Sequence, residues 1–141
     1  MHINHNNLSG EIPPGIGYLN SKVINLAHNN LEGKIPIDIF DSRELEVINL
    51  DYNLLQGSLP ASDKYFPNLH TFSAANNSLS GAIPEWIGRS TSLKALDIRD
   101  NFLTGSVPSN FEDLSELEIS KFRENYTLIH STNFHKNYFG A

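Results

Sequence analysis

The sequence predicts an α/β repeat solenoid, because nearly the same block of residues recurs at a fixed interval. The block N-x-L-x-G-x-[IVL]-P occurs five times in the 141 residues, and its opening Asn residues lie 23, 24, 24 and 24 residues apart. Those opening residues are Asn6, Asn29, Asn53, Asn77 and Asn101. A regular period of this length is the sequence signature of a solenoid. One further step of 24 residues reaches Asn125, which keeps the Asn but not the rest of the block.

A short strand is predicted before each Asn, where apolar residues recur at positions −8, −5 and −3 counted from that Asn. Leu93, Leu96 and Ile98 hold these positions before Asn101. The alternation of −5 and −3 is the pattern of a strand with one buried face. The Pro that closes the block has no N–H for a ladder, so it ends the second extended piece or lies at its edge. In the less regular segments that follow, such as 85–92 and 109–116, we expect short 3₁₀ or helical turns.

Composition excludes several classes of function. The formal net charge is −6, and the ten Lys and Arg residues are scattered, which argues against nucleic acid or an anionic membrane surface as partner. No run of about 18 apolar residues is present to span a membrane. The absence of Cys excludes disulfides, a cysteine nucleophile and thiolate metal sites. The first seven residues do not have the pattern of a signal peptide.

The repeated unit resembles a known family. The pattern L-x-x-L-x-L-x-x-N-x-L-x-G-x-I-P-x-x-[IL]-G is similar to the plant-specific leucine-rich repeat, and LSGEIPPGIG and LSGAIPEWIG are close to its consensus. The resemblance covers roughly residues 1–117 and implies a right-handed superhelix with a parallel β-sheet on the concave face and short 3₁₀ or irregular turns on the convex side. It also implies that each Asn amide bonds to backbone groups of adjacent turns, which a buried turn requires.

The repeats are expected to occupy residues 1–125, as about five units of 23–24 residues and a degenerate one, before an irregular tail at 126–141. The degenerate unit keeps Leu117 and Phe122 but has Ser120 where an apolar residue belongs. The chain begins within a strand and lacks the paired-cysteine caps that flank this family's domains. We therefore expect a fragment or a truncated gene product.

A binding surface is predicted on the concave face. If positions −5 and −3 face the core, then −6, −4, −2 and −1 face outward, and the repeat leaves them free to vary. The predicted ligand-binding residues are Asn25, Asn49, Asp51, Tyr52, Ser73, Asp97, Arg99 and Asp100. Five or six strands present about 400–500 Å², against about 800 Å² per partner in a standard interface. A solvated sheet face that contacts no partner is the other interpretation of these residues.

Three N-x-[ST] sequons make Asn7, Asn76 and Asn125 candidate glycosylation sites, and the extracellular family resemblance supports them. Asn7 and Asn76 are expected to be exposed. Asn125 holds the ladder position, where a buried amide cannot carry a sugar unless the last turn is frayed.

Catalysis and metal binding are not expected. The six His residues are not completed by Cys or carboxylates into a zinc site, and we predict no metal and no cofactor. Asp97 and Asp100 lie on an open sheet without the cleft that acid–base catalysis requires. No phosphate-binding Gly motif, nucleophile elbow or kinase signature occurs. Trp86 is expected to pack against the fold and not to stack on a ligand.

The sequence therefore predicts a non-catalytic recognition module, resembling part of the extracellular domain of a plant leucine-rich-repeat receptor in signalling or defence. Its partners would be a peptide, glycan or protein ligand and a co-receptor, and it would be monomeric. The resemblance places it on the extracellular side of the plasma membrane or in the cell wall. Two alternatives stay open: a soluble enzyme inhibitor resembling the polygalacturonase-inhibiting proteins, and a truncated fragment without a function of its own.

Overall fold

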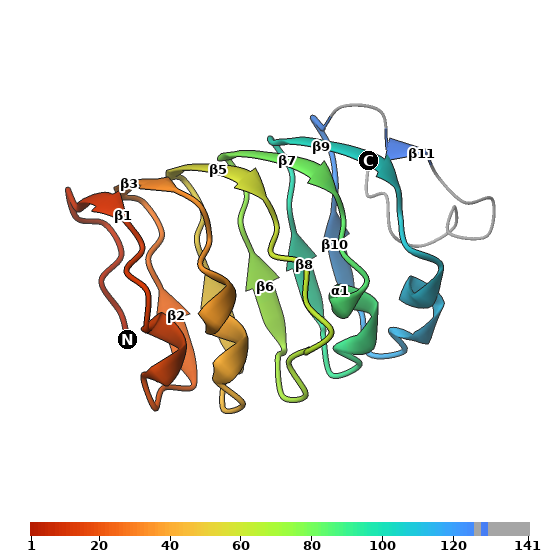
Figure 1. Cartoon of the computed structure of the whole chain (residues 1–141). Helices are drawn as coiled ribbons and strands as arrows, with labels where there is room; N and C mark the ends of the chain where they lie inside the picture. The colour runs from red at the N-terminus through yellow and green to blue at the C-terminus, as the bar shows by residue number, and fades with distance from the viewer. Residues whose placement is uncertain (126–127, 130–141) are drawn as a thin grey trace.

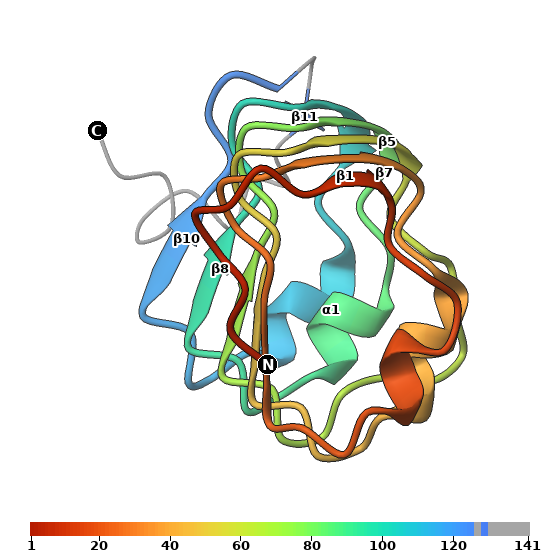
Figure 2. The same cartoon turned by 90° about the vertical axis from the view of Figure 1, so that its left-hand side faces the viewer.

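Each repeat forms one turn of a three-sided coil (Figures 1 and 2). The computed structural model describes residues 1–125 and 128–129. Its elements, in chain order, are β1 (Ser9–Glu11), η1 (Ile16–Tyr18), β2 (Val23–Asn25), β3 (Asn30–Gly33), η2 (Ile37–Asp41), β4 (Val47–Asn49), β5 (Leu54–Ser58), β6 (Thr71–Ser73), β7 (Ser78–Ala82), α1 (Trp86–Arg89), β8 (Ala95–Asp97), β9 (Phe102–Ser106), η3 (Ser109–Asp113), β10 (Ile119–Lys121) and β11 (Leu128–Ile129). The predicted right-handed solenoid is confirmed.

The first sheet is the predicted concave sheet, with strands in the order β2-β4-β6-β8-β10 and every pair parallel. Figure 1 shows these strands side by side along the molecule. The register pairs residues 24 positions apart, so that the inward residues Ile24, Ile48, Phe72, Leu96 and Ser120 form one row. The strand predicted for the degenerate repeat is present as β10. Its Ser120 is buried at the core position, as the alternation requires.

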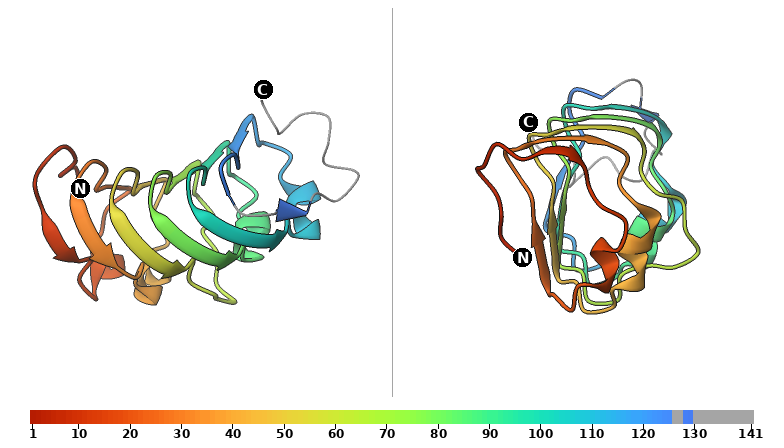
Figure 3. Two further views of the ribbon diagram at one scale, coloured as in Figure 1. Left: turned by 90° about the horizontal axis from the view of Figure 1, so that it is seen from above. Right: turned by 60° about the vertical axis from the view of Figure 1, so that its left-hand side comes forward.

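A second parallel sheet, in the order β1-β3-β5-β7-β9-β11, covers the side of the coil adjacent to the first sheet (Figures 2 and 3). The sequence predicted an extended piece in each repeat but did not predict that the pieces pair. A Gly with positive φ lies in each block, for example Gly81 at 77°, and redirects the chain without the strain of a Cβ. β11 pairs with Gly105 and Ser106 of β9. Residues 126–127 and 130–141 lie outside the described residues, so the division at residue 125 stays a prediction.

The interior between the sheets and the helical turns is one continuous apolar core. Trp86 is its largest fully buried side chain, and its Nε1 donates a hydrogen bond to the carbonyl oxygen of Pro60 at 2.9 Å. Its ring meets the rings of Phe40, Phe66 and Phe72 edge-on, with centroids 5.2, 5.5 and 5.3 Å away. Such edge-to-face pairs add about 0.5–1.5 kcal/mol each beyond the buried area. The prediction that Trp86 packs is confirmed.

The Asn residues form the predicted ladder between turns. In Asn77, Oδ1 accepts from the backbone N–H of Leu55 in the previous turn at 3.0 Å. Nδ2 donates to the carbonyl of Leu50 in the previous turn at 3.0 Å and to that of Ala74 in its own turn at 3.2 Å. Equivalent bonds are made by Asn29, Asn53, Asn101 and Asn125. Each amide therefore satisfies buried backbone groups of two turns at once.

Replacing Asn77 by Ala is expected to lower the free energy of unfolding by about 3 kcal/mol, because the buried Leu55 N–H loses its acceptor and the carbonyls of Leu50 and Ala74 each lose one of two amide donors. Urea unfolding followed by circular dichroism measures the change. Asn20→Ala, at an exposed Asn outside the ladder, should change the value by less than about 0.5 kcal/mol. Equal losses in the two variants would show that the ladder does not hold the turns together.

Candidate functional site

The outward columns of the concave sheet are aligned as the repeat predicts. The −4 residues of successive repeats pair directly: the isolated bridge joins His2 to Asn25, and the ladder continues through Asn49, Ser73, Asp97 and Lys121. Side chains at one repeat position therefore stand in a row across the sheet, with neighbours one strand spacing apart, about 4.8 Å. A ligand that lies on this face meets one member of each column per repeat.

The backbone conformation restricts which residue types can occupy the −1 column. The expectation that the repeat leaves the residue type at this position free to vary is wrong in this respect. All six residues have left-handed φ values between 53° and 56°: His5, His28, Tyr52, Asn76, Asp100 and Glu124. Asn, Asp and His are the non-Gly residues most often found in this conformation, whereas a bulky residue is an outlier there. Tyr52 is therefore the member of the column whose presence the backbone least explains.

The −4 column is also partly structural. The side-chain oxygens of Asn25, Asn49 and Asp97 each accept a hydrogen bond from the backbone N–H two residues later, at 3.2, 3.0 and 3.3 Å. This local bond fixes the end of the strand. Within the described part of the chain, the Nδ2 groups of Asn25 and Asn49 have no hydrogen-bond partner and are available as donors on the concave face.

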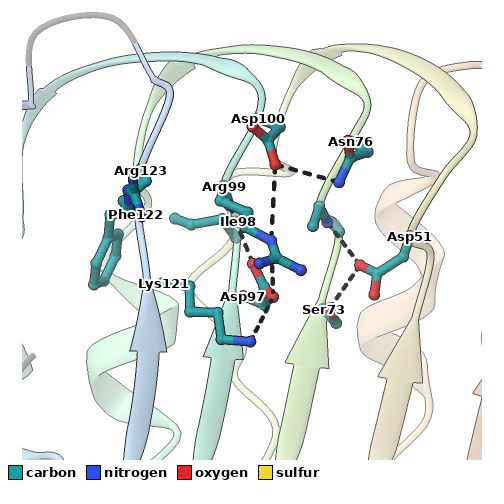
Figure 4. A network of polar contacts seen from close by, with 12 residues as sticks. Asp51, Ser73, Asn76, Asp97, Ile98, Arg99, Asp100, Lys121, Phe122 and Arg123 are labelled. Atoms are coloured by element: carbon teal, nitrogen blue, oxygen red, sulfur yellow. Dashed lines mark hydrogen bonds and ion pairs between the residues drawn. The ribbon is translucent and has the colours of Figure 1, made fainter. Parts of the chain in front are cut away.

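The charged side chains at the C-terminal end of the sheet neutralise one another (Figure 4). Nε of Arg99 lies 3.5 Å from Oδ2 of Asp97 and 3.7 Å from Oδ2 of Asp100. Nζ of Lys121 lies 3.7 Å from the same Asp97 oxygen, and Nδ2 of Asn76 donates to Asp100 at 3.3 Å. Three of the predicted ligand-binding residues thus belong to one ion-pair network, in which each exposed pair contributes at most about 1 kcal/mol.

Asp51 is bound differently. One carboxylate oxygen, Oδ1, accepts from the Ser73 hydroxyl at 2.6 Å and from the Ala75 N–H at 2.7 Å (Figure 4). The other, Oδ2, has no hydrogen-bond partner among the residues that the structure describes. Burial raises the pKa of the Asp51 carboxyl, and the two hydrogen bonds oppose that shift only in part. Ser73 itself is buried, so this predicted ligand residue acts here by positioning Asp51.

Three stacked rings lie beside these residues along the −1 column. The centroids of His5 and His28 are 4.2 Å apart with an interplanar angle of 12°, and those of His28 and Tyr52 are 4.4 Å apart with an angle of 13°. Tyr52 keeps 45% of its surface exposed. The sequence pattern predicted Tyr52 as a ligand residue but not His5 or His28. The available signal was a ring at the −1 position of three consecutive repeats.

The three sequons differ in accessibility. Asn7 is exposed, and its Oδ1 accepts from Nδ2 of Asn30 at 2.7 Å. Asn76 is half-buried at the rim of the concave face. Asn125 is fully engaged in the ladder: Nδ2 donates to the carbonyls of Ile98 and Phe122, both at 2.9 Å. Modification at any of these positions stays a prediction.

Residues 1–125 and 128–129 contain neither a metal-ligand cluster nor a membrane-spanning helix. No three His, Cys, Asp or Glu side chains gather there closely enough to hold a metal ion. None of the helices in this part of the chain has the length and apolar character needed to cross a membrane.

Comparison with known proteins identifies the repeat. The family model described as Leucine Rich Repeat matches residues 1–19, 20–41, 68–90 and 92–114, more than half of the chain. It passes over residues 42–67, although β4 and β5 of that repeat pair in register with their neighbours. A comparison with curated protein sequences gave no match.

Several solved structures share this fold. The plant peptide hormone receptor RGFR1 in complex with RGF2 is 36% identical, with a TM-score of 0.82, over 88% of this chain and 20% of that one. The Arabidopsis receptor kinase HAESA, in complex with the peptide hormone IDA and the co-receptor SERK1, is 29% identical, with a TM-score of 0.84, over 88% and 21%. Pollen Receptor Kinase 3 is 32% identical, with a TM-score of 0.82, over 93% and 63%. The chain spans about a fifth of the length of the first two.

Replacing Asp51 by Asn is expected to leave the protein at least as stable at pH 7, since an amide keeps an acceptor for Ser73 and Ala75 and removes a partly desolvated charge. Because the folded-state pKa is raised, ionised Asp51 lowers the free energy of unfolding as pH rises from the ordinary value of 3.8 through the folded-state value. The advantage of the variant should therefore disappear below about pH 4.

Urea unfolding of both proteins from pH 3.5 to 8 tests this sign. Asp100→Asn is the matched control, because it removes a carboxylate that is paired with Arg99 and should give no gain at pH 7. A loss of stability in Asp51→Asn at pH 7 would mean that bonds specific to the carboxylate outweigh its desolvation.

Proposed function

Because this chain belongs to the leucine-rich repeat family, we propose that it is a non-catalytic recognition module from the extracellular domain of a plant receptor, and that it binds a peptide on its concave face. The observation that carries the proposal is the combined likeness in fold and sequence to receptor structures that contain peptide hormones, RGFR1 with RGF2 and HAESA with IDA.

The concave face offers suitable chemistry for an extended peptide. The Nδ2 groups of Asn25 and Asn49 are donors for peptide carbonyls, Oδ2 of Asp51 is an acceptor, and the exposed ring of Tyr52 offers apolar contact. The ladder and the core hold these groups on a rigid sheet, so binding does not require them to be ordered first. These groups stand on an open sheet face, which suits recognition of an extended ligand.

The partners follow from the same likeness. HAESA is seen with both a peptide hormone and the co-receptor SERK1, and we infer that a co-receptor is a second partner of the receptor to which this module belongs. The concave area of about 400–500 Å² is smaller than the about 800 Å² that one partner of a standard interface buries. The module therefore supplies only part of a binding surface. By likeness to the receptors, that surface lies on the extracellular side of the plasma membrane.

The soluble-inhibitor alternative is less well supported, because the solved structures that resemble the chain include plant receptors and the ectodomain of a plant membrane receptor kinase. Inhibition of a polygalacturonase by the purified chain would reverse this order. A role in defence, as distinct from other signalling, remains part of the proposal.

We also propose that Asn7 and Asn76 carry N-linked glycans. Expression through a plant secretory pathway, followed by peptide mass spectrometry, should show occupancy at these two residues and none at Asn125, because the Asn125 amide is used by the ladder. A glycan on Asn125 would show that its turn opens before the fold is complete. A glycan on Asn76 would stand beside Tyr52 in the −1 column and narrow the ligand surface, whereas one on Asn7 would leave it clear.

Peptide binding can be tested by selection from a randomised peptide library displayed on phage, with the purified chain as target. We expect selected peptides to bind saturably, and Thr71→Trp, which places a bulky ring on the concave sheet, to weaken them at least tenfold. Thr104→Trp is the matched control, since Thr104 is exposed on β9 of the second sheet. An absence of binders, or equal losses in both variants, would contradict the proposal.

A further inference from the structure

We propose that Asp51, Tyr52 and His28 form a subsite for a cationic side chain, Arg or Lys, of the bound peptide. The inference rests on the proposed function and goes beyond it by assigning the chemistry of one ligand residue to one place on the concave face.

The charges on the concave face are not fully paired. Of the three Asp residues in the −4, −2 and −1 columns, Asp97 lies 3.5 Å from Arg99 and 3.7 Å from Lys121, and Asp100 lies 3.7 Å from Arg99. No ion pair to Asp51 occurs in the described part of the chain. Counting these five side chains, the middle of the face has three carboxylates and two cations, so that one negative charge is left at Asp51. A ligand cation would complete the pairing.

The neighbouring repeat fixes the orientation of the Asp51 carboxylate. Ser73 and the Ala75 N–H hold Oδ1, and both of these residues are small and buried, which leaves room for the carboxylate to point toward β6 (Figure 4). Oδ2 is thereby kept in one orientation without a partner. A partly desolvated carboxylate gains more from a counter-charge than a fully hydrated one, because the attraction is less screened. The site is therefore set to bind a cation before any ligand arrives.

An aromatic stack lies beside this carboxylate. Tyr52 follows Asp51 directly, and His28 stacks on its ring at a centroid distance of 4.4 Å. Asn76, the next residue of the −1 column, directs its amide to Asp100, and Tyr52 keeps 45% of its surface exposed. Arg and Lys bind aromatic faces within about 6 Å, with about 0.5–1 kcal/mol at exposed sites. A carboxylate next to an exposed ring therefore suits both parts of an Arg or Lys side chain. The carboxylate pairs with the charged group, and the ring contacts the apolar stem.

Asp51 and Tyr52 each carry a local cost to folding. Tyr52 occupies left-handed backbone with φ 53°, where Asn or Asp would be less strained, and it lies outside the buried core. Asp51 lies partly out of water, and within the described part of the chain Arg99 acts on it only from beyond ion-pair distance. Local costs at two adjacent residues point to a ligand contact.

The library selection described above supplies the test when it is run in parallel on the parent chain and on Asp51→Asn, at pH 8 so that Asp51 is ionised. We expect Arg or Lys to be enriched at one position of the peptides selected by the parent and not by the variant. Replacing that residue by citrulline, the neutral isostere of Arg, should weaken binding to the parent at least tenfold and change binding to Asp51→Asn less than twofold. Asp113→Asn is the control, because it removes an exposed carboxylate at the end of η3, outside the concave face, and it should behave as the parent does.

The outcomes separate this inference from the proposed function. Peptides that bind the concave face without enriched Arg or Lys, or with the same citrulline effect in Asp51→Asn, would overturn the cation subsite and leave the proposed function standing. A citrulline effect that is lost equally in Asp113→Asn would show that binding follows the net charge of the protein and not the Asp51 carboxylate, and it would also overturn the inference. If no peptide binds, both proposals fail together.

Discussion

A single side-chain amide per turn holds the solenoid together. Asn has one acceptor and two donor hydrogens on a short side chain, and in Asn77 these reach an N–H and a carbonyl of the preceding turn and carbonyls of its own. A longer or apolar residue would leave the Leu55 N–H without its acceptor and the carbonyls of Leu50 and Ala74 with only the amide of the neighbouring ladder Asn. Because the same amide recurs every 24 residues, each turn repeats the one before it, and the core, the two sheets and the surface columns all inherit that spacing.

Repetition also determines how side chains are arranged on the concave face. Residues at one position of the repeat share backbone dihedral angles and stand one strand apart, so flat side chains at that position stack without further design. His5, His28 and Tyr52 do so at 4.2 and 4.4 Å. Opposite charges meet for the same reason, within one column as in Asp97 and Lys121 or between columns as in Asp97 and Arg99. What distinguishes Asp51 is that Ser73 and Ala75, its neighbours in the next repeat, are small and carry no cation.

Residues of the scaffold and residues of the candidate site contribute differently to the stability of the fold. Ladder and core positions, such as Asn77 and Trp86, satisfy every polar group or bury large apolar area. Asp51 and Tyr52 oppose folding, the first by desolvation and the second by its left-handed backbone. A rigid repeat core can hold a few such residues in place, and a ligand that pairs with them recovers the free energy they cost.

The sequence by itself determined the period, the inward strand positions and the ladder residue, since each depends on a pattern within one repeat: Ile48 and Leu50 alternate, and Asn53 follows. It also located the columns from which Asp51 and Tyr52 project. The pairing of the second extended pieces into a sheet, the structural bonds of Asn25 and Asn49, and the neutralisation of Asp97 and Asp100 were decided only by the tertiary structure. These three features depend on which side chain lies opposite in the next turn and on the rotamer it adopts. Both are decided only when the turns are stacked on one another.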